Sequence, residues 1–556
     1  MLLQAARLLR CTEDGRPFYD EFTAVFATLI SSLPLETHTV GLFHARYDFS
    51  FSSEEAMSNL TELKLQQQNK TIDVTGRLVT STTITTYQID ARSGAELMQL
   101  FLNARLIRCA NDPEKGKFKH EMLFQLTPKG IAIVDAFSQR HGVASPNVVD
   151  LLKSKNNSMK LMYLERDPLS DQISSSESVI QIVFQRFAGH KPNTTPMRRA
   201  YSHRSQSQPL GGHSSPPFGG PSSSTTTVAL GPGHHQTHYG TPTAHYDTVS
   251  SILTRESIDT DDSSVSDMYV ESSAGVHVHD SKRVHLKEYN NCFSGIAGKL
   301  WLMDCTSIIF VAEAQMILAG FLKYGLITPA DSRLMAMGEK FVMEKNAYYC
   351  MSEKGKSLAG WPSSGSGRHH RNGYKFPTSN DSRSPHRHSS AIVGDNKQSR
   401  LEYILGDPAL RLLFREHLAE NFCDENLTFY LESEKLLAQF HDLEKTQIPT
   451  LQKVNVCLSE AWVVYHAFLA PGSASEVNID DLLRQRVRER MTSEEVDTLS
   501  ISGLQYAALI PTSVNKLTEI VKLLNEVRMQ VFRLMASDSV PKFMRTAKFL
   551  ELGIEI

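Results

Sequence analysis

The sequence predicts a multidomain, mainly α-helical fold in which two α+β modules and two disordered linkers precede an all-α helical bundle. Three observations predict this organisation. Ser, Thr, Pro and Gly make up 29 of the 50 residues from 201 to 250, which is typical of disordered sequence. Two stretches before the bundle repeat one another, and the last block has helical periodicity with no strand pattern.

The two linkers stand out by composition. Residues 192–279 and 362–398 hold few aliphatic side chains, so they cannot bury enough apolar surface to offset the entropy lost on ordering. The second linker is basic, and we expect membrane contact there. The linkers leave three ordered blocks, at 1–191, 280–361 and 399–553.

A divergent internal repeat defines the two α+β modules. FLNARLI at 101–107 is matched by FLKYGLI at 321–327, and LTPKG at 126–130 by MSEKG at 351–355. In each copy an apolar helix pattern ends in a turn, and a strand-like run then leads to the Lys-Gly turn. The strand-like runs lie at 122–126 and 347–351. We therefore expect two helix-rich modules closed by a hairpin, although matches this short also arise by chance.

A further helix is predicted behind the first module. Ser174 and Glu177 have the spacing of a capping box, and Gly189 supplies the stop. Its apolar face consists of Val179, Ile180, Val183, Phe184 and Phe187. Because such a face needs a surface to cover, we place this helix in the first block, which therefore extends beyond its first module.

The third block reads as helices only. Asp407 is positioned to cap a helix that has Pro408 at its first position, and a second helix follows Asp424. Later helices are expected at 458–469 and 514–535. A helical bundle is the architecture that such a block predicts.

Catalytic signatures are missing from the sequence. It has no phosphate-binding loop, no kinase signature, no G-x-S-x-G and no H-E-x-x-H, so we expect neither an autonomous enzyme nor a cofactor. The histidine pairs at 234–235 and 369–370 lie in linker sequence without supporting residues to orient metal ligands. We therefore expect no metal site.

Charge and cysteine content exclude further classes. With 58 Lys and Arg against 61 Asp and Glu, the net charge is −3, without the basic surplus of a nucleic-acid binder. Seven scattered cysteines without a C-x-x-C pair predict free thiols in a reducing compartment. The most apolar stretch, 300–322, contains Asp304 and Glu313, which argue against a membrane span.

Polar residues gather where helices of the third block begin or end. ENFCDEN at 420–426 joins two helices, EVNID at 476–480 lies in a loop, and LMASDS at 534–539 ends the last long helix. Three such segments would form one contact surface if they met at the same end of the bundle. Periodicity alone does not decide whether they meet.

These segments resemble the RGS domain, the regulator of G-protein signalling. The resemblance runs from 401 to 549 through LEYILGDPALRLLF, ENFCDENLTFY, EVNID and FRLMASDSVPKF, in that order. The two repeats resemble the DEP modules of fungal FlbA-type regulators, which implies winged-helix-like folds of three helices and a β-hairpin. The DEP motifs are FTAVFATLISSLPL, YDFSFSSEEAMSNL and QLTPKG in the first repeat, and LWLMDCTSIIF and FLKYGLI in the second.

The resemblance implies a GTPase-activating protein for the α subunit (Gα) of a heterotrimeric G protein. Such a domain supplies no catalytic group. It holds the Gα switch segments in their transition-state arrangement, because Gα already carries its own arginine and a water-orienting glutamine, which Asn478 is expected to approach. The implied Gα-binding residues are Glu420, Glu425, Asn426, Asn478, Asp480, Leu534, Asp538, Ser539 and Lys542.

Two departures from the family pattern leave an alternative open. Lys542 stands where the family often has Arg, and Lys cannot make the bidentate contacts that Arg makes. The segment 491–513 is longer than in compact RGS domains. The alternative is a non-catalytic Gα-binding scaffold or effector antagonist in which the DEP modules carry the main role.

The DEP modules imply targeting. We expect a cytoplasmic protein that is recruited to the inner face of the plasma membrane, either by a G-protein-coupled receptor tail or by lipid. Four lysines of the second module would form a basic edge, or an ordinary solvated surface: Lys340, Lys345, Lys354 and Lys356.

One linker motif predicts a further partner. RSQSQP at 204–209 fits the R-S-x-S-x-P pattern, which resembles a 14-3-3 ligand when Ser207 is phosphorylated. The added phosphate would be bound by an arginine cluster. Such matches also arise by chance in Ser-rich sequence.

Overall fold

The computed structural model describes residues 9, 11–40, 45–72, 78–87, 89–111, 116–141, 146–154, 159–167, 170–194, 269, 274–284, 287–362, 397–446, 450–473, 475–492 and 506–550. Ser207, both histidine pairs, nearly all of the basic linker and most of the segment 491–513 lie outside these residues. The expectations about them stay predictions.

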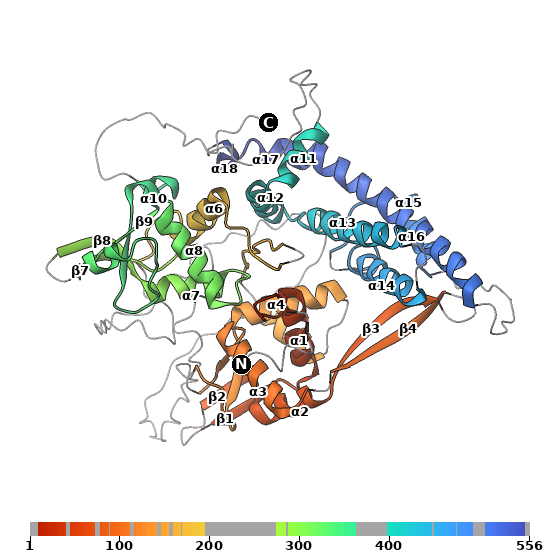
Figure 1. Cartoon of the computed structure of the whole chain (residues 1–556), viewed down its shortest axis with the longest axis horizontal. Coiled ribbons are helices and arrows are strands. Elements are labelled where there is room, and N and C mark those ends of the chain that lie inside the picture. Colours follow the sequence, from red (N-terminus) through yellow and green to blue (C-terminus); the bar gives the residue numbers. More distant parts are fainter. Residues whose placement is uncertain are drawn as a thin grey trace, which may run out of the picture. The chain divides into compact units, whose positions relative to one another are not determined.

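The first repeat folds into an α+β module (Figure 1). Its elements are α1 (Tyr19–Ser32), β1 (Glu36–Val40), β2 (Ala45–Ser52), α2 (Ser53–Thr61), β3 (Leu63–Ile72), β4 (Leu78–Tyr87), α3 (Ala91–Asn103), β5 (Ile107–Cys109), β6 (Leu123–Leu126), α4 (Pro128–His141) and α5 (Pro146–Lys153). An antiparallel sheet has the order β1-β2-β6-β5. Phe101 of α3 packs against Phe22 and Phe26 of α1, with ring centroids 5.2 and 5.1 Å apart. The strand predicted at 122–126 is confirmed as β6.

A long hairpin interrupts this module between α2 and α3. β3 and β4 pair from Leu63 with Tyr87 to Ile72 with Leu78. Figure 1 shows the hairpin as two orange ribbons that extend away from the other strands of the module. The sequence did not predict it, because Gln, Asn and Thr fill much of both strands and leave little apolar alternation to recognise.

The second repeat has the same architecture. Its elements are α6 (Glu177–Ala188), β7 (His279–Val284), β8 (Lys287–Ser294), α7 (Gly295–Cys305), α8 (Val311–Lys323), β9 (Ile327–Pro329), α9 (Ser332–Ala336), β10 (Tyr348–Met351) and α10 (Glu353–Leu358). The sheet order, β7-β8-β10-β9, matches that of the first module. A Cβ on Gly130 would lie 2.1 Å from the Leu106 carbonyl oxygen, and one on Gly355 would lie 2.1 Å from that of Leu326. The shared topology and this shared close approach confirm the internal repeat.

Helix α6 packs in the second module, which corrects its expected place in the first block. Phe184 and Phe187 lie with ring centroids 5.1 and 5.0 Å from Phe321 of α8, and Phe187 lies 5.3 Å from Trp301 of α7. Phe101, which corresponds to Phe321, is held by α1 in the same way. Helix α6 is therefore the counterpart of α1, and a long linker separates it from the rest of its module.

The two sides of that linker close on one another. The backbone N–H of Val276 donates to the Phe187 carbonyl at 2.7 Å, and that of Val278 donates to the Asn193 carbonyl at 2.8 Å. Trp361 Nε1 donates to the Gly189 carbonyl at 2.8 Å. Because Val276 and Val278 are buried, the second module includes residues on both sides of the linker, and it begins before the expected start at 280.

Capping of α6 also differs from the expectation. Ser176, not Ser174, accepts from the backbone N–H of Val179, whereas Gly189 ends the helix with φ +70° as expected. The Asp407 cap is confirmed, because its carboxylate accepts from the N–H groups of Ala409 and Leu410 at 2.8 and 3.0 Å.

The regular elements of the third block are all helices among its described residues. They are α11 (Lys397–Gly406), α12 (Pro408–Glu420), α13 (Glu425–Glu444), α14 (Leu451–Phe468), α15 (Asp481–Thr492), α16 (Tyr506–Leu534), α17 (Val540–Phe543) and α18 (Ala547–Leu550). A π-helical segment, Met535–Ser539, joins α16 to α17. Both α14 and α16 begin seven or eight residues before their predicted starts at 458 and 514.

Buried charges connect the first module to the second. Lys129 Nζ donates to the carbonyl oxygens of Met303, at 2.6 Å, and of Ile308. Arg105 Nη2 donates to Asp304 Oδ2 at 3.0 Å. Buried charges are retained where they are paired and hydrogen-bonded, and Arg105 and Asp304 meet that condition. Lys129 is hydrogen-bonded to two carbonyl oxygens instead.

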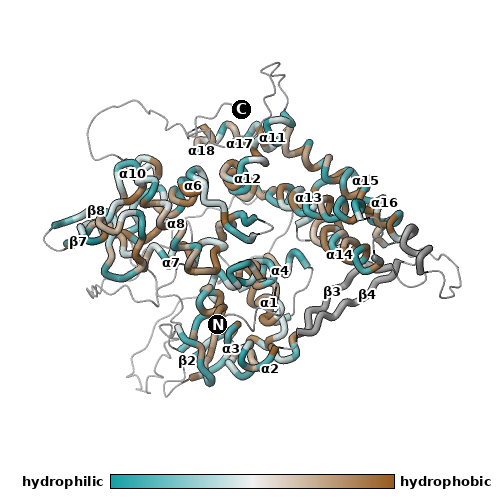
Figure 2. The backbone as a smooth tube through the Cα atoms, in the orientation of Figure 1, coloured by the Kyte–Doolittle hydropathy of each residue, from teal (hydrophilic) through white to brown (hydrophobic). Residues whose placement is uncertain are grey.

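The most apolar stretch of the chain forms parts of α7 and α8, which are largely brown in Figure 2. Among the described residues, no helix is long and apolar enough to cross a bilayer. The same residues hold no group of three or more His, Cys, Asp or Glu side chains placed to bind a metal.

Candidate functional site

The first predicted contact segment lies at the junction of α12 and α13. Glu420 is the last residue of α12, and Glu425 and Asn426 are the first two of α13. Between the helices the chain turns at Phe422, which has φ +54° and whose side chain is 87% exposed. The short connection places a carboxylate at each side of an exposed aromatic ring.

Asn426 is buried at the start of α13. Its Nδ2 donates to the Cys423 carbonyl at 3.2 Å and to Glu425 Oε1 at 3.1 Å. Its Oδ1 is buried and has no hydrogen-bond partner within the described structure. Burial, together with the neighbouring Asp424, raises the pKa of Glu425. An unsatisfied buried acceptor costs stability unless a partner reaches it.

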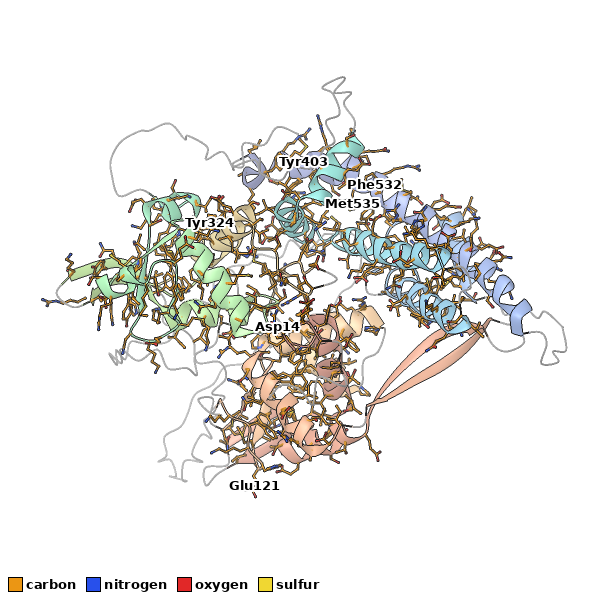
Figure 3. The ribbon with its side chains drawn as sticks, in the orientation of Figure 1. Asp14, Glu121, Tyr324, Tyr403, Phe532 and Met535 are labelled. Atoms are coloured by element: carbon orange, nitrogen blue, oxygen red, sulfur yellow. The ribbon has the colours of Figure 1, made fainter. Side chains whose placement is uncertain are left out.

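The third segment is the π-helical junction of α16 and α17. Phe532 and Met535, which Figure 3 labels, are buried and anchor it, as does Ser539. Leu534 is half-buried, whereas Asp538 and Lys542 are exposed and form an ion pair at 2.8 Å. Single π-helical turns inside α-helices occur frequently at functional sites.

The structure brings the first and third segments together. The His417 ring packs 5.7 Å from that of Phe543, and Lys548 Nζ pairs with Glu420 at 3.0 Å. Burial and the nearby acids Glu425, Asp424 and Asp538 raise the pKa of the Cys423 thiol, so the carboxylate of the third segment is within electrostatic reach of the first.

The second segment joins the first through the core. Asn478 is exposed between two buried residues, Val477 and Ile479. The Val477 N–H donates to the Phe468 carbonyl at 3.0 Å, and the Phe468 ring lies 5.6 Å from that of Phe429, one turn beyond Asn426. No hydrogen bond between described residues joins Asn478 directly to the other two segments.

Asp480 has a local structural role. Its Oδ1 accepts from the backbone N–H groups of Leu482 and Leu483 at 3.0 and 3.2 Å. It therefore caps α15, and its other carboxylate oxygen can still meet a partner. Carboxylates near a helix N-terminus are also stabilised by the helix dipole.

Exposed acids outnumber cations among the predicted contact residues and their neighbours, although Lys548 pairs with Glu420. Glu420, Asp424, Asp480 and Asp538 are exposed, and Lys542, the cation among the predicted residues, is paired with Asp538. Such a surface favours a partner with basic segments, because complementary charge steers and orients association.

Sequence reasoning missed one feature of this surface. Phe422 lies in the ENFCDEN motif but is not among the predicted Gα-binding residues, although it is the most exposed large apolar residue in the described structure. Lys160 of the first block lies with its Nζ 6.0 Å from the centre of that ring. The only sequence signal was an aromatic residue between two polar helix ends.

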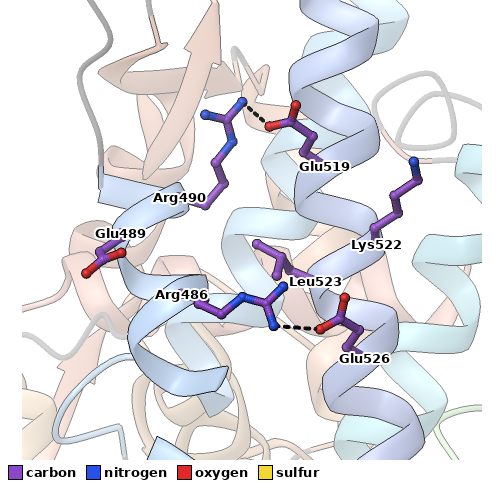
Figure 4. A pocket seen from close by; sticks show the side chains of 7 residues that line it. All are labelled: Arg486, Glu489, Arg490, Glu519, Lys522, Leu523 and Glu526. Carbon is purple, nitrogen blue, oxygen red and sulfur yellow. Dashed lines mark hydrogen bonds and ion pairs between the residues drawn. The ribbon is translucent and has the colours of Figure 1, made fainter. Parts of the chain in front are cut away.

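Two other surfaces give weaker evidence for a binding site. An open pocket of about 500 Å³ between α15 and α16 is lined by paired opposite charges, Arg486 with Glu526 and Arg490 with Glu519 (Figure 4). The lining of this pocket therefore has no excess of positive or negative charge.

On the expected basic edge, Lys354 donates to the Tyr324 carbonyl and Lys356 pairs with Glu353, whereas Lys340 and Lys345 are exposed.

Family profiles match all three folded parts of the chain. Residues 400–552 match the regulator of G protein signaling domain, and residues 275–351 match the domain found in Dishevelled, Egl-10 and Pleckstrin (DEP). Residues 21–154 match the fungal-differentiation regulator winged helix domain. The expected α-helical RGS bundle behind two winged-helix-like modules is thereby confirmed.

Two curated relatives are similar over nearly the whole chain. The developmental regulator flbA of Emericella nidulans is 34% identical over 98% of this chain, which spans 65% of that protein. Regulator of G-protein signaling 1 of Schizosaccharomyces pombe is 24% identical over 97% of this chain and 92% of its own length.

Proposed function

Because this chain belongs to the DEP-repeat RGS proteins of the FlbA type, we propose that it is a GTPase-activating protein for a heterotrimeric Gα subunit and so terminates receptor signalling. One observation carries the proposal most directly. The first and third contact segments meet at one end of the bundle, beside a buried asparagine whose carbonyl oxygen is unpartnered.

In this proposal, each segment binds a different feature of Gα. The exposed carboxylates Glu420, Asp480 and Asp538 meet basic groups of the switch segments. Asn426 Oδ1 accepts a hydrogen bond from Gα, and the Asn478 amide orients the glutamine that positions the attacking water. Leu534 contributes apolar contact, and Glu425, Ser539 and Lys542 complete the surface. Stabilising the transition-state arrangement accelerates hydrolysis without a catalytic group from this chain.

Single-turnover GTP hydrolysis by a Gα subunit of the same organism tests the proposal. We expect the purified full chain to accelerate hydrolysis, and Asn478→Ala to reduce that acceleration by tenfold or more, at the level of a binding hot spot of ~2 kcal/mol. Asn426→Ala is expected to act similarly. Asn103→Ala, an exposed asparagine of the first module, is the matched control. No acceleration with any Gα of that organism would refute the proposal.

A pull-down separates an activator from the alternative, a scaffold or effector antagonist. An activator retains Gα most strongly when GDP and aluminium fluoride mimic the transition state. Equal retention of the GTP-analogue form would instead favour the scaffold. Lys542 of α17 pairs with Asp538 of the π-helical segment, four residues before it. This pairing leaves the lysine a smaller role in Gα binding than an arginine, with its bidentate contacts, would have, and it is the observation that favours the scaffold.

We further propose that the two winged-helix modules recruit the protein from the cytoplasm to the inner face of the plasma membrane, through a receptor tail or lipid. Lys340→Glu with Lys345→Glu reverses two exposed charges of the second module. If lipid is the target, this variant should bind less to vesicles that contain anionic lipid, while Gα stimulation in solution is unchanged. Unaltered vesicle binding would point to the receptor tail.

A further inference from the structure

Two cysteines face one another across the central strands of the second module. β8 and β10 are antiparallel neighbours, and their register pairs Tyr348 with Ser294, Tyr349 with Phe293, and Cys350 with Cys292. The chain offers no other cross-strand cysteine pair among the registers of its described strands.

The backbone pattern places this pair at a position where side chains come closest. The N–H of Gly295 donates to the Ala347 carbonyl at 2.7 Å, which makes residues 295 and 347 a hydrogen-bonded pair. Hydrogen-bonded and non-hydrogen-bonded pairs alternate along an antiparallel ladder, so Cys292 and Cys350, three pairs further on, form a non-hydrogen-bonded pair.

Hydrogen bonds between β10 and its other neighbour, β9, also indicate that Cys292 and Cys350 form a non-hydrogen-bonded pair. The N–H of Ala330 donates to the Tyr348 carbonyl, and the N–H of Ser352 donates to the Leu326 carbonyl. The backbone groups of residues 348, 350 and 352 therefore point to β9 rather than to β8. Cα atoms of a non-hydrogen-bonded pair are about 4.5 Å apart, within the range of about 4.4–6.8 Å that a disulfide spans.

The pair lies on the face of the sheet opposite the main core. Phe293 and Tyr349, the adjacent residues, are fully buried in that core, with ring centroids 6.1 Å apart. Since side chains alternate between faces, the two cysteines point the other way. There they form a small separate cluster with Ala330, Val284, Tyr289 and Tyr348.

The thiols also influence one another. A hydrogen bond from Cys292 lowers the pKa of Cys350, and the nearby Lys356 ammonium acts in the same direction against the effect of burial. Cys350 is 7% exposed, whereas Cys292 is fully buried. Thiolate character and access are what make a cysteine reactive, so Cys350 is the expected nucleophile.

The first module lacks this pair at the matching position. Phe51 and Phe124 pair across β2 and β6 as Phe293 and Tyr349 do across β8 and β10. The next pair along is Ser50 with Gln125, where the second module has its two cysteines. The dithiol is therefore a property of the second module alone.

We propose that Cys292 and Cys350 are a redox-modification site that forms a reversible disulfide with a peroxide as oxidant. The Cys350 thiolate attacks a peroxide oxygen, the O–O bond breaks, and a sulfenic acid forms as hydroxide leaves and takes up a proton. The Cys292 sulfur then displaces the sulfenic hydroxyl and loses its proton, so that two thiols and one hydrogen peroxide give one disulfide and two waters. Two molecules of a small thiol such as glutathione restore both cysteines by exchange, through a mixed disulfide, and leave as their own disulfide.

Mass spectrometry of the full chain tests the site. After hydrogen peroxide treatment of the native protein, free thiols are alkylated in denaturant and the digest is analysed without reduction. We expect a linked peptide pair that carries Cys292 and Cys350 and disappears on reduction. We also expect the oxidised protein to melt at a higher temperature than the reduced protein, because the bridge ties β8 to β10.

Two variants sharpen the result. Cys292→Ser should abolish both the linked peptides and the rise in melting temperature. Cys109→Ser, which removes a buried thiol of the first module, should change neither. Full alkylation of Cys292 and Cys350 after peroxide, or pairing of Cys350 with other cysteines as often as with Cys292, would overturn the proposal.

Discussion

At the scale of single residues, the buried amine of Lys129 should make stability depend on pH. Burial lowers its pKa from 10.5 to about 7, so between these values the unfolded state holds a proton that the folded state has released. The free energy of unfolding should therefore rise with pH from about 7 to about 10.5, and this group should add no slope below about 7.

Lys129→Met is expected to remove that slope, which amounts to about 1.4 kcal/mol per pH unit. The measurement is the melting temperature of the full chain at several pH values between 7 and 9. Lys354→Met alters the corresponding, half-buried lysine of the second repeat and should leave the slope in place. The same slope in wild type and Lys129→Met would contradict the prediction.

The contact residues show how far sequence reasoning reached at this scale. The sequence placed Glu420 correctly at a helix end and Asn478 correctly in a loop between helices, because caps and helix stops have local signatures. It predicted that the last long helix ends at Asp538, whereas the helical structure continues there through a π-helical segment into α17. It did not show that the first and third segments meet, since that contact depends on packing such as His417 against Phe543. Nor did it show that Asp480 caps α15 or that Phe422 is exposed, because both depend on the local backbone.

At the scale of elements, the two glycines of the matched Lys-Gly steps tolerate substitution poorly. The sequence predicted turns there, but Gly130 lies in the first turn of α4 and Gly355 in that of α10. A methyl group on Gly130 or Gly355 would collide with a backbone carbonyl that cannot yield without moving a neighbouring strand. Gly130→Ala and Gly355→Ala should each lower the free energy of unfolding by ~1–3 kcal/mol. Gly116→Ala, with open space around it, is the control in the same thermal unfolding assay. Equal effects at positions 116 and 130 would rule the idea out.

Helices and strands could be predicted from the sequence where the local pattern of apolar residues matches the way the element packs in the fold. β6, β10 and the bundle helices follow from short apolar runs and helix periodicity that the fold uses directly. The β3–β4 hairpin was missed because its strands alternate little. The sequence identified α6 but assigned it to the wrong module, because the surface that covers Phe184 and Phe187 comes from α7 and α8, far along the chain.

At the scale of the whole molecule, the first linker is an insertion within the second module rather than a connection between modules. Its two sides are bridged between Asn193 and His277, and Trp361 closes on Gly189. The length of such a closed loop affects the stability of the module that closes it, whereas a linker between independently folded parts has no such effect.

Deleting residues 195–268 and joining the ends with a short Gly-Ser loop should therefore stabilise the second module. A loop roughly eight times shorter lowers the closure cost by about 2 kcal/mol, which should raise the melting temperature of the transition that includes α6. Deleting residues 363–396 removes a linker whose flanking residues are joined by no backbone hydrogen bond between described residues, and is expected to leave that transition unchanged. If the first deletion unfolds the second module, or if the two deletions act alike, α6 does not close the module and the linker must separate independent parts.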